Sequence, residues 1–231
     1  MLVSLTIVRY RKAFIPFALL AMAVHRIPLS LTKGCTFWKL MGCGKNGTFD
    51  INPDWQQWGL LAVWASKGSF ERFIANSSIS SWWQTFTKEQ YTILCEPLSS
   101  HGKWDGKEPF GNVKVKEYQG PVAVLTRASI RLKRLKNFWQ NVDKAAANMT
   151  STPGYLLSFG IGEAPLHLQA TFSVWENVEA VKNYAYASND HREVIKKTRE
   201  ENWYSEELFA RFKPLATFGT INGIDPLAGK I

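Results

Sequence analysis

The sequence repeats one pattern of strands and helices, and this duplication constrains the fold more than any other feature. In each half a β-rich run ends in Val-Trp, at Trp64 and again at Trp175, and a long amphipathic helical pattern follows it. Upstream of each tryptophan lies another β-rich run that ends in Gly-x-Gly, at residues 42–44 and 160–162. A repeat of this kind predicts two copies of one structural unit.

A strand and a helix precede these runs in each half, and a last strand follows them. The predicted elements of the first half are residues 2–8, 14–27, 36–44, 61–64, 70–86 and 91–97, and those of the second are 122–130, 132–149, 156–162, 171–175, 181–198 and 208–215. The order is β-α-β-β-α-β twice, which is the ferredoxin-like unit, an antiparallel sheet with both helices on one face. The fold class is therefore α+β.

The two units set the expected domain boundaries. We expect residues 1–98 to form the first ferredoxin-like repeat and residues 121–231 the second. Residues 99–120 contain four glycines and are expected to connect the two. Two such sheets can pair face to face or edge to edge, and either arrangement predicts a dimeric α+β barrel around an apolar cavity.

Composition narrows the function classes. Apolar residues make up 45% and charged residues 20%, as in ordinary globular proteins, and no uncharged apolar run reaches the length of a transmembrane helix. The net charge of +9 suits an anionic membrane, an acidic ligand or nucleic acid. Nucleic acid is the least favoured, because the basic residues are spread along the chain and no nucleic-acid motif is present. Three cysteines without a metal spacing favour a reducing compartment.

The N-terminal region contains an apolar run, residues 13–24, directly after Arg9, Arg11 and Lys12. This resembles the start of a signal peptide, but no small-residue cleavage pattern follows, so a core helix is favoured. The same helix and the basic charge would also suit contact with an anionic membrane, although a solvated face explains the charges equally well. We expect a cytoplasmic protein, peripheral to the inner face of the membrane.

A comparison of the two halves singles out His191 as a candidate site residue. With Trp64 aligned on Trp175, His191 falls opposite Ser80, and residues found in only one repeat are candidates for a site. On its predicted helix His191 shares the apolar face with Tyr184. A buried imidazole needs a hydrogen-bond partner or a metal, so a satisfied core histidine and an axial ligand of haem iron both remain open.

Haem would also need cations for its propionates and a flat apolar slot. Arg192 and Arg199 are candidates for the cations, and Trp175 and Trp203 for the slot.

The other histidines have weaker signals. His167, between two β-rich runs, is a candidate turn residue or a group on the distal side of the haem. His25 ends the apolar helix, where a cation suits the helix dipole. His101 is expected to be solvated.

Several segments resemble the spheroidene monooxygenase family, the acyclic carotenoid 2-ketolases. They are residues 37–44, 55–64, 120–128, 160–163, 170–175, 191–195 and 203–212, and they span nearly the whole chain in order. The resemblance implies an O2-dependent oxygenase of long linear polyenes, a haem b cofactor and the dimeric α+β-barrel architecture. Since no flavin or nicotinamide motif is present, electrons would come from an external reductant such as ferredoxin.

The resemblance favours His191 as the iron ligand, with His167 as the second choice. Arg127 is a candidate for polarising bound O2 from the distal side, and the alternative is a surface or salt-bridged strand residue. Two oxygen insertions at an allylic carbon would give a gem-diol, which loses water to form a ketone. A cofactor-free oxygenase and a non-catalytic haem- or polyene-binding protein remain open, and the sequence is compatible with a homo-oligomer.

Overall fold

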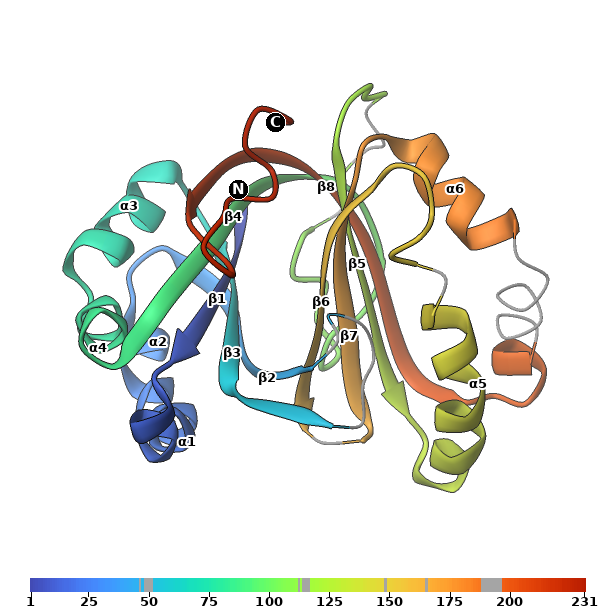
Figure 1. The fold of residues 1–231 in the computed structure, drawn as a ribbon, viewed down its shortest axis with the longest axis horizontal. Coiled ribbons are helices and arrows are strands. Elements are labelled where there is room, and N and C mark those ends of the chain that lie inside the picture. Colours follow the sequence, from blue (N-terminus) through green and yellow to red (C-terminus); the bar gives the residue numbers. More distant parts are fainter. Residues whose placement is uncertain are drawn as a thin grey trace.

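The chain forms a closed eight-stranded barrel with its helices outside, as the computed structural model shows (Figure 1). The structure describes residues 1–45, 47, 52–111, 113, 117–147, 149–164, 166–187 and 197–231. In Figure 1 the helices of the first repeat lie at the left of the barrel and those of the second repeat at the right.

The observed elements follow the predicted order in both repeats. The first repeat contains β1 (Leu2–Tyr10), α1 (Ile15–Val24), α2 (Arg26–Leu31), β2 (Cys35–Gly44), β3 (Pro53–Trp64), α3 (Lys67–Asn76), α4 (Ser78–Phe86) and β4 (Thr87–Gly102). The second contains β5 (Val122–Ile130), α5 (Leu135–Ala147), β6 (Tyr155–Ala164), β7 (Leu168–Trp175), α6 (Val178–Ala187) and β8 (Tyr204–Gly219). Short 3-10 turns, η1 (Lys12–Phe14) and η2 (Leu132–Arg134), precede α1 and α5.

The strands are ordered β1-β3-β2-β6-β7-β5-β8-β4 around the barrel, and each neighbouring pair is antiparallel. The first repeat forms a sheet in the order β4-β1-β3-β2, and the second forms the equivalent sheet in the order β8-β5-β7-β6. The two sheets join edge to edge. At one edge β4 pairs with β8 over a long stretch, from Tyr91 opposite Gly219 to Gly102 opposite Leu208, and we call this pairing the β4–β8 joint. At the other edge β2 and β6 pair only at residues 42–43 of β2. The predicted duplication and the α+β barrel are confirmed.

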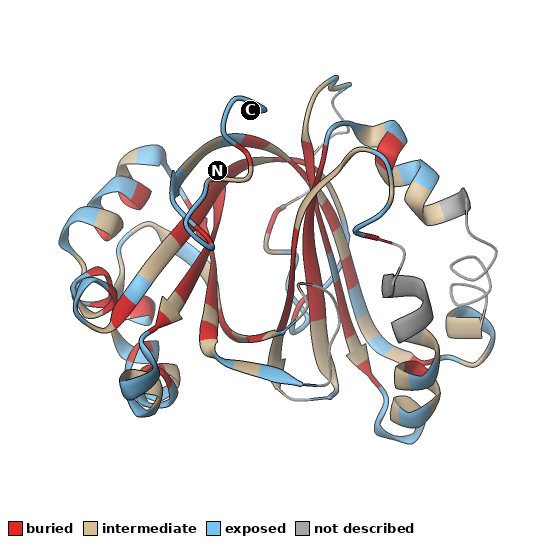
Figure 2. Ribbon diagram, viewed as in Figure 1, coloured by how far each residue is buried: buried red, intermediate tan, exposed pale blue. Residues whose placement is uncertain are grey.

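The barrel interior is packed, so the expected apolar cavity is wrong. Alternate residues of the strands point inward and form one buried cluster drawn from both repeats, including Val3, Leu5 and Ile7 of β1 and Ala123 and Leu125 of β5. Figure 2 shows the buried positions continuing along the strands from one repeat into the other. The alternation places the remaining buried residues of each sheet on its outer face, beneath the helices.

Two arms complete the interior cluster. The first arm, residues 103–111, follows β4 and buries Trp104 and Phe110, and the second, residues 220–228, follows β8 and buries Ile221 and Leu227. In each arm a tight turn is closed by a bridge, Trp104 with Lys107 and Ile221 with Ile224. Much of the expected connector is therefore part of the barrel, and β4 itself continues past residue 98 to Gly102.

A glutamate at the same place in each repeat holds the arm of the other repeat. Glu206 accepts hydrogen bonds from the backbone N–H groups of Asp105 and Gly106. Glu89 likewise accepts from the backbone of Gly223 and from the hydroxyl of Thr220. The duplication thus includes the arms, and each arm reaches across the β4–β8 joint.

The N-terminal helices only partly meet the expectation of a core helix. Ala18, Ala21 and Leu29 pack against the sheet, whereas most of the other side chains of α1 and α2 are exposed. By length and composition alone, residues 12–31 are apolar enough to cross a membrane.

Burial shifts the pKa of two side chains in the first repeat, and one of them, His25, was expected to be charged. His25 is 4% exposed, and burial lowers its pKa to about 4, so the expected cation at the helix end is wrong. The three cysteines are free. Cys43 belongs to the buried cluster of the barrel interior, and burial raises its pKa to about 12.

Candidate functional site

In the first repeat the centre of the outer face of the sheet is covered. Thr6 lies at the centre of this face on β1 and is 1% exposed, and its hydroxyl lies 2.9 Å from the hydroxyl of Thr92. Its cross-strand neighbour Leu60 is also buried. The helices and the sheet share one continuous apolar cluster. Side chains of this repeat therefore cover the centre of its sheet.

The same position in the second repeat is open. Thr126 of β5 pairs with Thr171 of β7 and with Phe209 of β8, in the register that Thr6 has in the first repeat. Thr126 is exposed, although Val124 and Ala128, its neighbours on the same face of the strand, are buried. Solvent therefore reaches Thr126 at the middle of an otherwise covered strand, and we call this exposed position of the outer sheet face the opening.

Two buried polar atoms beside this opening have no hydrogen-bond partner among the described residues. They are the hydroxyl of Thr171 and Nε of Arg211, whose guanidinium lies 5.5 Å from the centre of the Phe209 ring. The first repeat has Leu60 and Leu94 at these two places, and both are buried in its apolar cluster. A buried polar group without a partner costs roughly 1–3 kcal/mol, so in native proteins it calls for a bound group or an ordered water.

Two separate aromatic clusters lie on either side of the opening. In the first cluster Trp175 packs with Val122 and Val124, and the centre of its ring lies 5.1 Å from the centre of the Tyr184 ring. In the second cluster Trp203 packs with Phe138. Trp175 and Trp203, which were predicted to form the flat apolar slot for haem, therefore share the outer face of the sheet with Thr126. Trp175 occupies the same place as Trp64, and each indole donates to a serine hydroxyl, which gives both of them a core role as well.

Arg127 faces the other way, into the barrel. Its side chain is 2% exposed and pairs with Glu206, with Asp105 at 3.5 Å and with Glu163 at 3.9 Å. The guanidinium also lies 5.4 Å from the centre of the Trp104 ring. Arg127 is therefore a salt-bridged strand residue, and the sheet separates it from Trp175 and Trp203.

The carboxylate of Glu206 anchors this charged cluster. Burial acts to raise its pKa, but hydrogen bonds from the backbone of Gly106 and Asp105 and from Arg127 outweigh burial and hold the pKa below its ordinary value. Lys39 adds a further contact to Glu163 at 2.5 Å. The cluster ties the first arm to both repeats.

The remaining predicted site residues are dispersed. His167 lines an open cleft of about 730 Å³ at the end of β5, together with Arg131, Lys133 and Arg134. Arg199 is exposed in a short helical turn, residues 197–200. His191 and Arg192 lie outside the described residues. Among the described residues, no three His, Cys, Asp or Glu side chains lie close enough to hold a metal ion.

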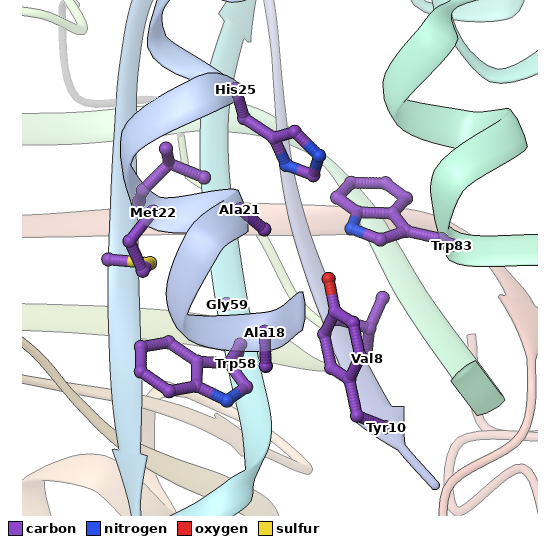
Figure 3. A pocket seen from close by; sticks show the side chains of 10 residues that line it. Val8, Tyr10, Ala18, Ala21, Met22, His25, Trp58, Gly59 and Trp83 are labelled. Atoms are coloured by element: carbon purple, nitrogen blue, oxygen red, sulfur yellow. The ribbon is translucent and has the colours of Figure 1, made fainter. Parts of the chain in front are cut away.

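The first repeat does contain a small cavity, which Figure 3 shows. It measures about 10 Å³, enough for one water molecule, and lies between α1 and the sheet. His25, Tyr10 and Trp83 line it, and Nε2 of His25 has no partner among the described residues. Burial raises the pKa of Tyr10 to about 12, against a hydrogen bond from Trp82. An organic ligand does not fit here.

Sequence reasoning missed Thr126, Thr171 and Arg211. Their signal was present in the duplication, since the equivalent residues Leu60 and Leu94 are apolar where Thr171 and Arg211 are polar. Threonine hydroxyls and an arginine on a strand match no catalytic or binding motif, so no motif singles these residues out.

Comparison with known proteins then gives the family. A spheroidene monooxygenase of Rhodobacter capsulatus is 34% identical over 219 residues, which cover 94% of this chain and 91% of that protein. The chain belongs to the spheroidene monooxygenase family. A second member, from Cereibacter sphaeroides, is 36% identical over 207 residues, 89% of this chain, and the match spans 64% of that protein's length.

Two further matches concern the fold and part of the chain. Residues 121–211 match a family described as a domain of unknown function, DUF3291. The crystal structure of an aldoxime dehydratase has a TM-score of 0.62 at 11% identity, over 92% of this chain and 80% of that one. At this identity the likeness shows a shared fold, which agrees with the duplicated barrel.

Proposed function

We propose that the protein is a monooxygenase that inserts oxygen into a carotenoid or a similar long apolar polyene. Relatives that share 34–36% of its residues over most of the chain are named spheroidene monooxygenases. The observation that carries the proposal is this family membership. It is supported by the exposure of Thr126 on the outer sheet face of the second repeat, where the first repeat has the buried Thr6.

We propose haem b as the cofactor, bound between the sheet and the helices of the second repeat. The chemistry of this region fits the group, because apolar aromatic clusters flank the opening and the buried hydroxyl of Thr171 and Nε of Arg211 have no partner in the described chain. When bound, haem would supply the activation of O2.

Specific residues are proposed to hold the cofactor. His191 would bind the iron, with His167 as the second candidate. Arg192 and Arg199 would pair with the propionates, and Trp175 and Trp203 would form apolar walls. Arg127 is proposed to act from the barrel interior by holding the first arm in place, since it lies on the inner side of the sheet.

The reaction balances with O2 and an external electron donor, for which ferredoxin is a suitable class. Each round would use one O2, two electrons and two protons, placing one oxygen atom in the product and one in water. The first round converts an allylic CH2 to CHOH and the second gives a gem-diol. Loss of water then leaves a ketone.

An absorption spectrum tests the cofactor proposal. Protein purified from haem-supplemented cells is expected to show a Soret band that disappears in His191→Ala and persists in the matched control His167→Ala. Thr171→Leu, which copies Leu60 of the first repeat, is expected to weaken the band by filling the opening. A band lost only in His167→Ala moves the ligand to that residue.

Turnover tests the activity itself. With spheroidene, O2 and a reduced ferredoxin, the parent protein is expected to form hydroxylated and then keto products, and His191→Ala is expected to form neither. Turnover without any Soret band would favour the cofactor-free oxygenase. A Soret band, or tight polyene binding, without products would favour the non-catalytic binding protein.

A further inference from the structure

Exposed apolar residues follow one another along α1 and α2. Five exposed residues lie at helical spacing in one stripe, and Leu19 lies beside it. The exposed fractions are Phe17 37%, Leu19 48%, Leu20 50%, Val24 40%, Ile27 69% and Leu31 75%. We call these six residues the apolar stripe; in Figure 2 much of the α1 ribbon has the colour of exposed residues.

Neighbouring helices in the same layer show that the fold does not require such a face. The outward residues of α3 include Lys67 and Glu71, and those of α4 include Ser81 and Gln84. These helices expose polar side chains, as expected for a face in water. The apolar stripe is therefore a local property of α1 and α2.

The duplication supplies a second internal comparison. In α5, the helix equivalent to α1, Gln140 stands where α1 has Leu20, and Lys136 stands where α1 has Pro16. Both are exposed. Two helices at equivalent places thus differ in what they present outward, so the stripe of α1 is not needed to build the repeat.

The charged residues of the segment that carries the stripe are all positive. Residues 1–49 contain no aspartate or glutamate. Arg11 and Lys12 lie at one end of the helix pair and Arg26 and Lys33 nearer the other, and all four are exposed. Within the described chain none of these four cations takes part in a salt bridge. They are available to an external anion.

We infer that the apolar stripe docks on the surface of an anionic lipid bilayer. An apolar helix face with a basic rim is the pattern of helices that lie in the plane of a membrane interface. Each cation near such a surface adds about 1 kcal/mol of attraction. Because Ala18, Ala21 and Leu29 pack against the sheet, α1 and α2 would lie along the membrane rather than cross it.

A second copy of this chain is the less suitable partner. A two-fold contact would bring the same face of both copies together and place basic residues opposite basic residues, with no carboxylate from residues 1–49 to pair them. The inferred surface goes beyond the proposed chemistry, since it needs neither haem nor turnover. It would place the protein where apolar polyenes dissolve.

Vesicle flotation of the full chain tests this surface. The parent protein is expected to float with vesicles of phosphatidylcholine and phosphatidylglycerol, and more weakly with phosphatidylcholine alone. Leu20→Gln/Ile27→Gln is expected to lower the affinity at least tenfold. The matched control Ile224→Gln, which changes an exposed isoleucine on the second arm, is expected to leave it unchanged.

A second double variant tests the basic rim, which consists of the exposed cations Arg11, Lys12, Arg26 and Lys33. Arg26→Gln/Lys33→Gln is expected to weaken binding to the anionic vesicles and to leave the weak binding to phosphatidylcholine unchanged. Circular dichroism and thermal unfolding that match the parent would show that each variant is folded, and an unchanged Soret band would separate docking from cofactor binding.

Three outcomes would overturn the inference. They are a parent that does not float, flotation that Leu20→Gln/Ile27→Gln leaves intact, and sedimentation showing a dimer that this variant dissociates. The last would assign the stripe to contact between two copies.

Discussion

His25 illustrates at the residue scale how burial changes an expected charge. At the end of an apolar helix a protonated imidazole would suit the helix dipole. The ring instead packs at steep angles to the rings of Trp82 and Trp83, and the cost of burying a charge there lowers its pKa to about 4. In the folded protein His25 is therefore neutral at pH 7.

This shift predicts a pH-dependent stability. Below pH 6.5 the unfolded chain binds a proton at His25 that the folded protein does not bind until about pH 4, so stability is lost as the pH falls through this window. Between pH 7.5 and 5 we expect a loss on the order of 2 kcal/mol. Urea unfolding at the two pH values measures it, and in His25→Leu most of the loss should vanish. An equal loss in both proteins would contradict the assignment.

Replacing threonine by valine is expected to have opposite effects on the free energy of unfolding at Thr171 and at Thr6. Thr171→Val removes a buried hydroxyl that has no partner among the described residues, so we expect the protein without a bound ligand to gain about 1 kcal/mol in free energy of unfolding. Thr6→Val removes a hydroxyl bonded to Thr92, so a loss of about 1 kcal/mol is expected. Denaturant unfolding of both variants gives the comparison, and a loss in Thr171→Val would show that its hydroxyl has a partner.

At the element scale the arms depend on glycines where β4 and β8 end. Gly102 and Gly219 have φ of +87° and +81°, a region that favours glycine. A Cβ at Gly102 would lie 2.2 Å from the carbonyl oxygen of Glu207, and one at Gly219 2.1 Å from that of Gln90. Each arm thus turns so close to the neighbouring strand that a side chain has no room.

The second arm supplies a matched pair of variants. Gly219→Ala is expected to cost at least about 3 kcal/mol, because it adds a backbone clash to an unfavourable φ. Gly223→Ala has the same φ of +81° but open space around its Cβ, so it should cost only about 1 kcal/mol. Thermal unfolding ranks the two, and equal losses would mean that the close approach to Gln90 does not matter.

At the scale of the whole molecule, the two repeats share one core. Residues of β1 and β5 and of both arms belong to a single buried cluster, and β4 pairs with β8 along most of its length. Either repeat alone would expose the inner face of its sheet. The barrel is therefore the cooperative unit, although each repeat has a complete ferredoxin-like topology.

This shared core predicts a single unfolding transition. Far-UV circular dichroism, which reports on the strands and helices, and tryptophan fluorescence should give coincident curves in urea. If the fluorescence of the repeats changed at separate urea concentrations, the repeats would be independent domains. The measurement needs only the full chain.

Part of the molecule could be read from sequence. The periodicity of apolar residues predicted the strands and helices of both repeats, and alignment of Trp64 with Trp175 predicted the duplication. The tryptophans of the proposed slot also lie on the same sheet face as the opening. These features depend on residues close together in the chain, or on one repeat resembling the other.

Other features depend on contacts between distant segments. The pleat of β5 places Arg127 and Thr126 on opposite faces, but only barrel closure makes one face an interior and leaves the other open beneath the helices. The arms pack as they do because β4 and β8 carry them across the joint. By itself the sequence determined the repeated unit, since local periodicity selects strands and helices. Which faces are buried, open or exposed was decided only by the tertiary structure, because covering a face requires residues that lie far away in the chain.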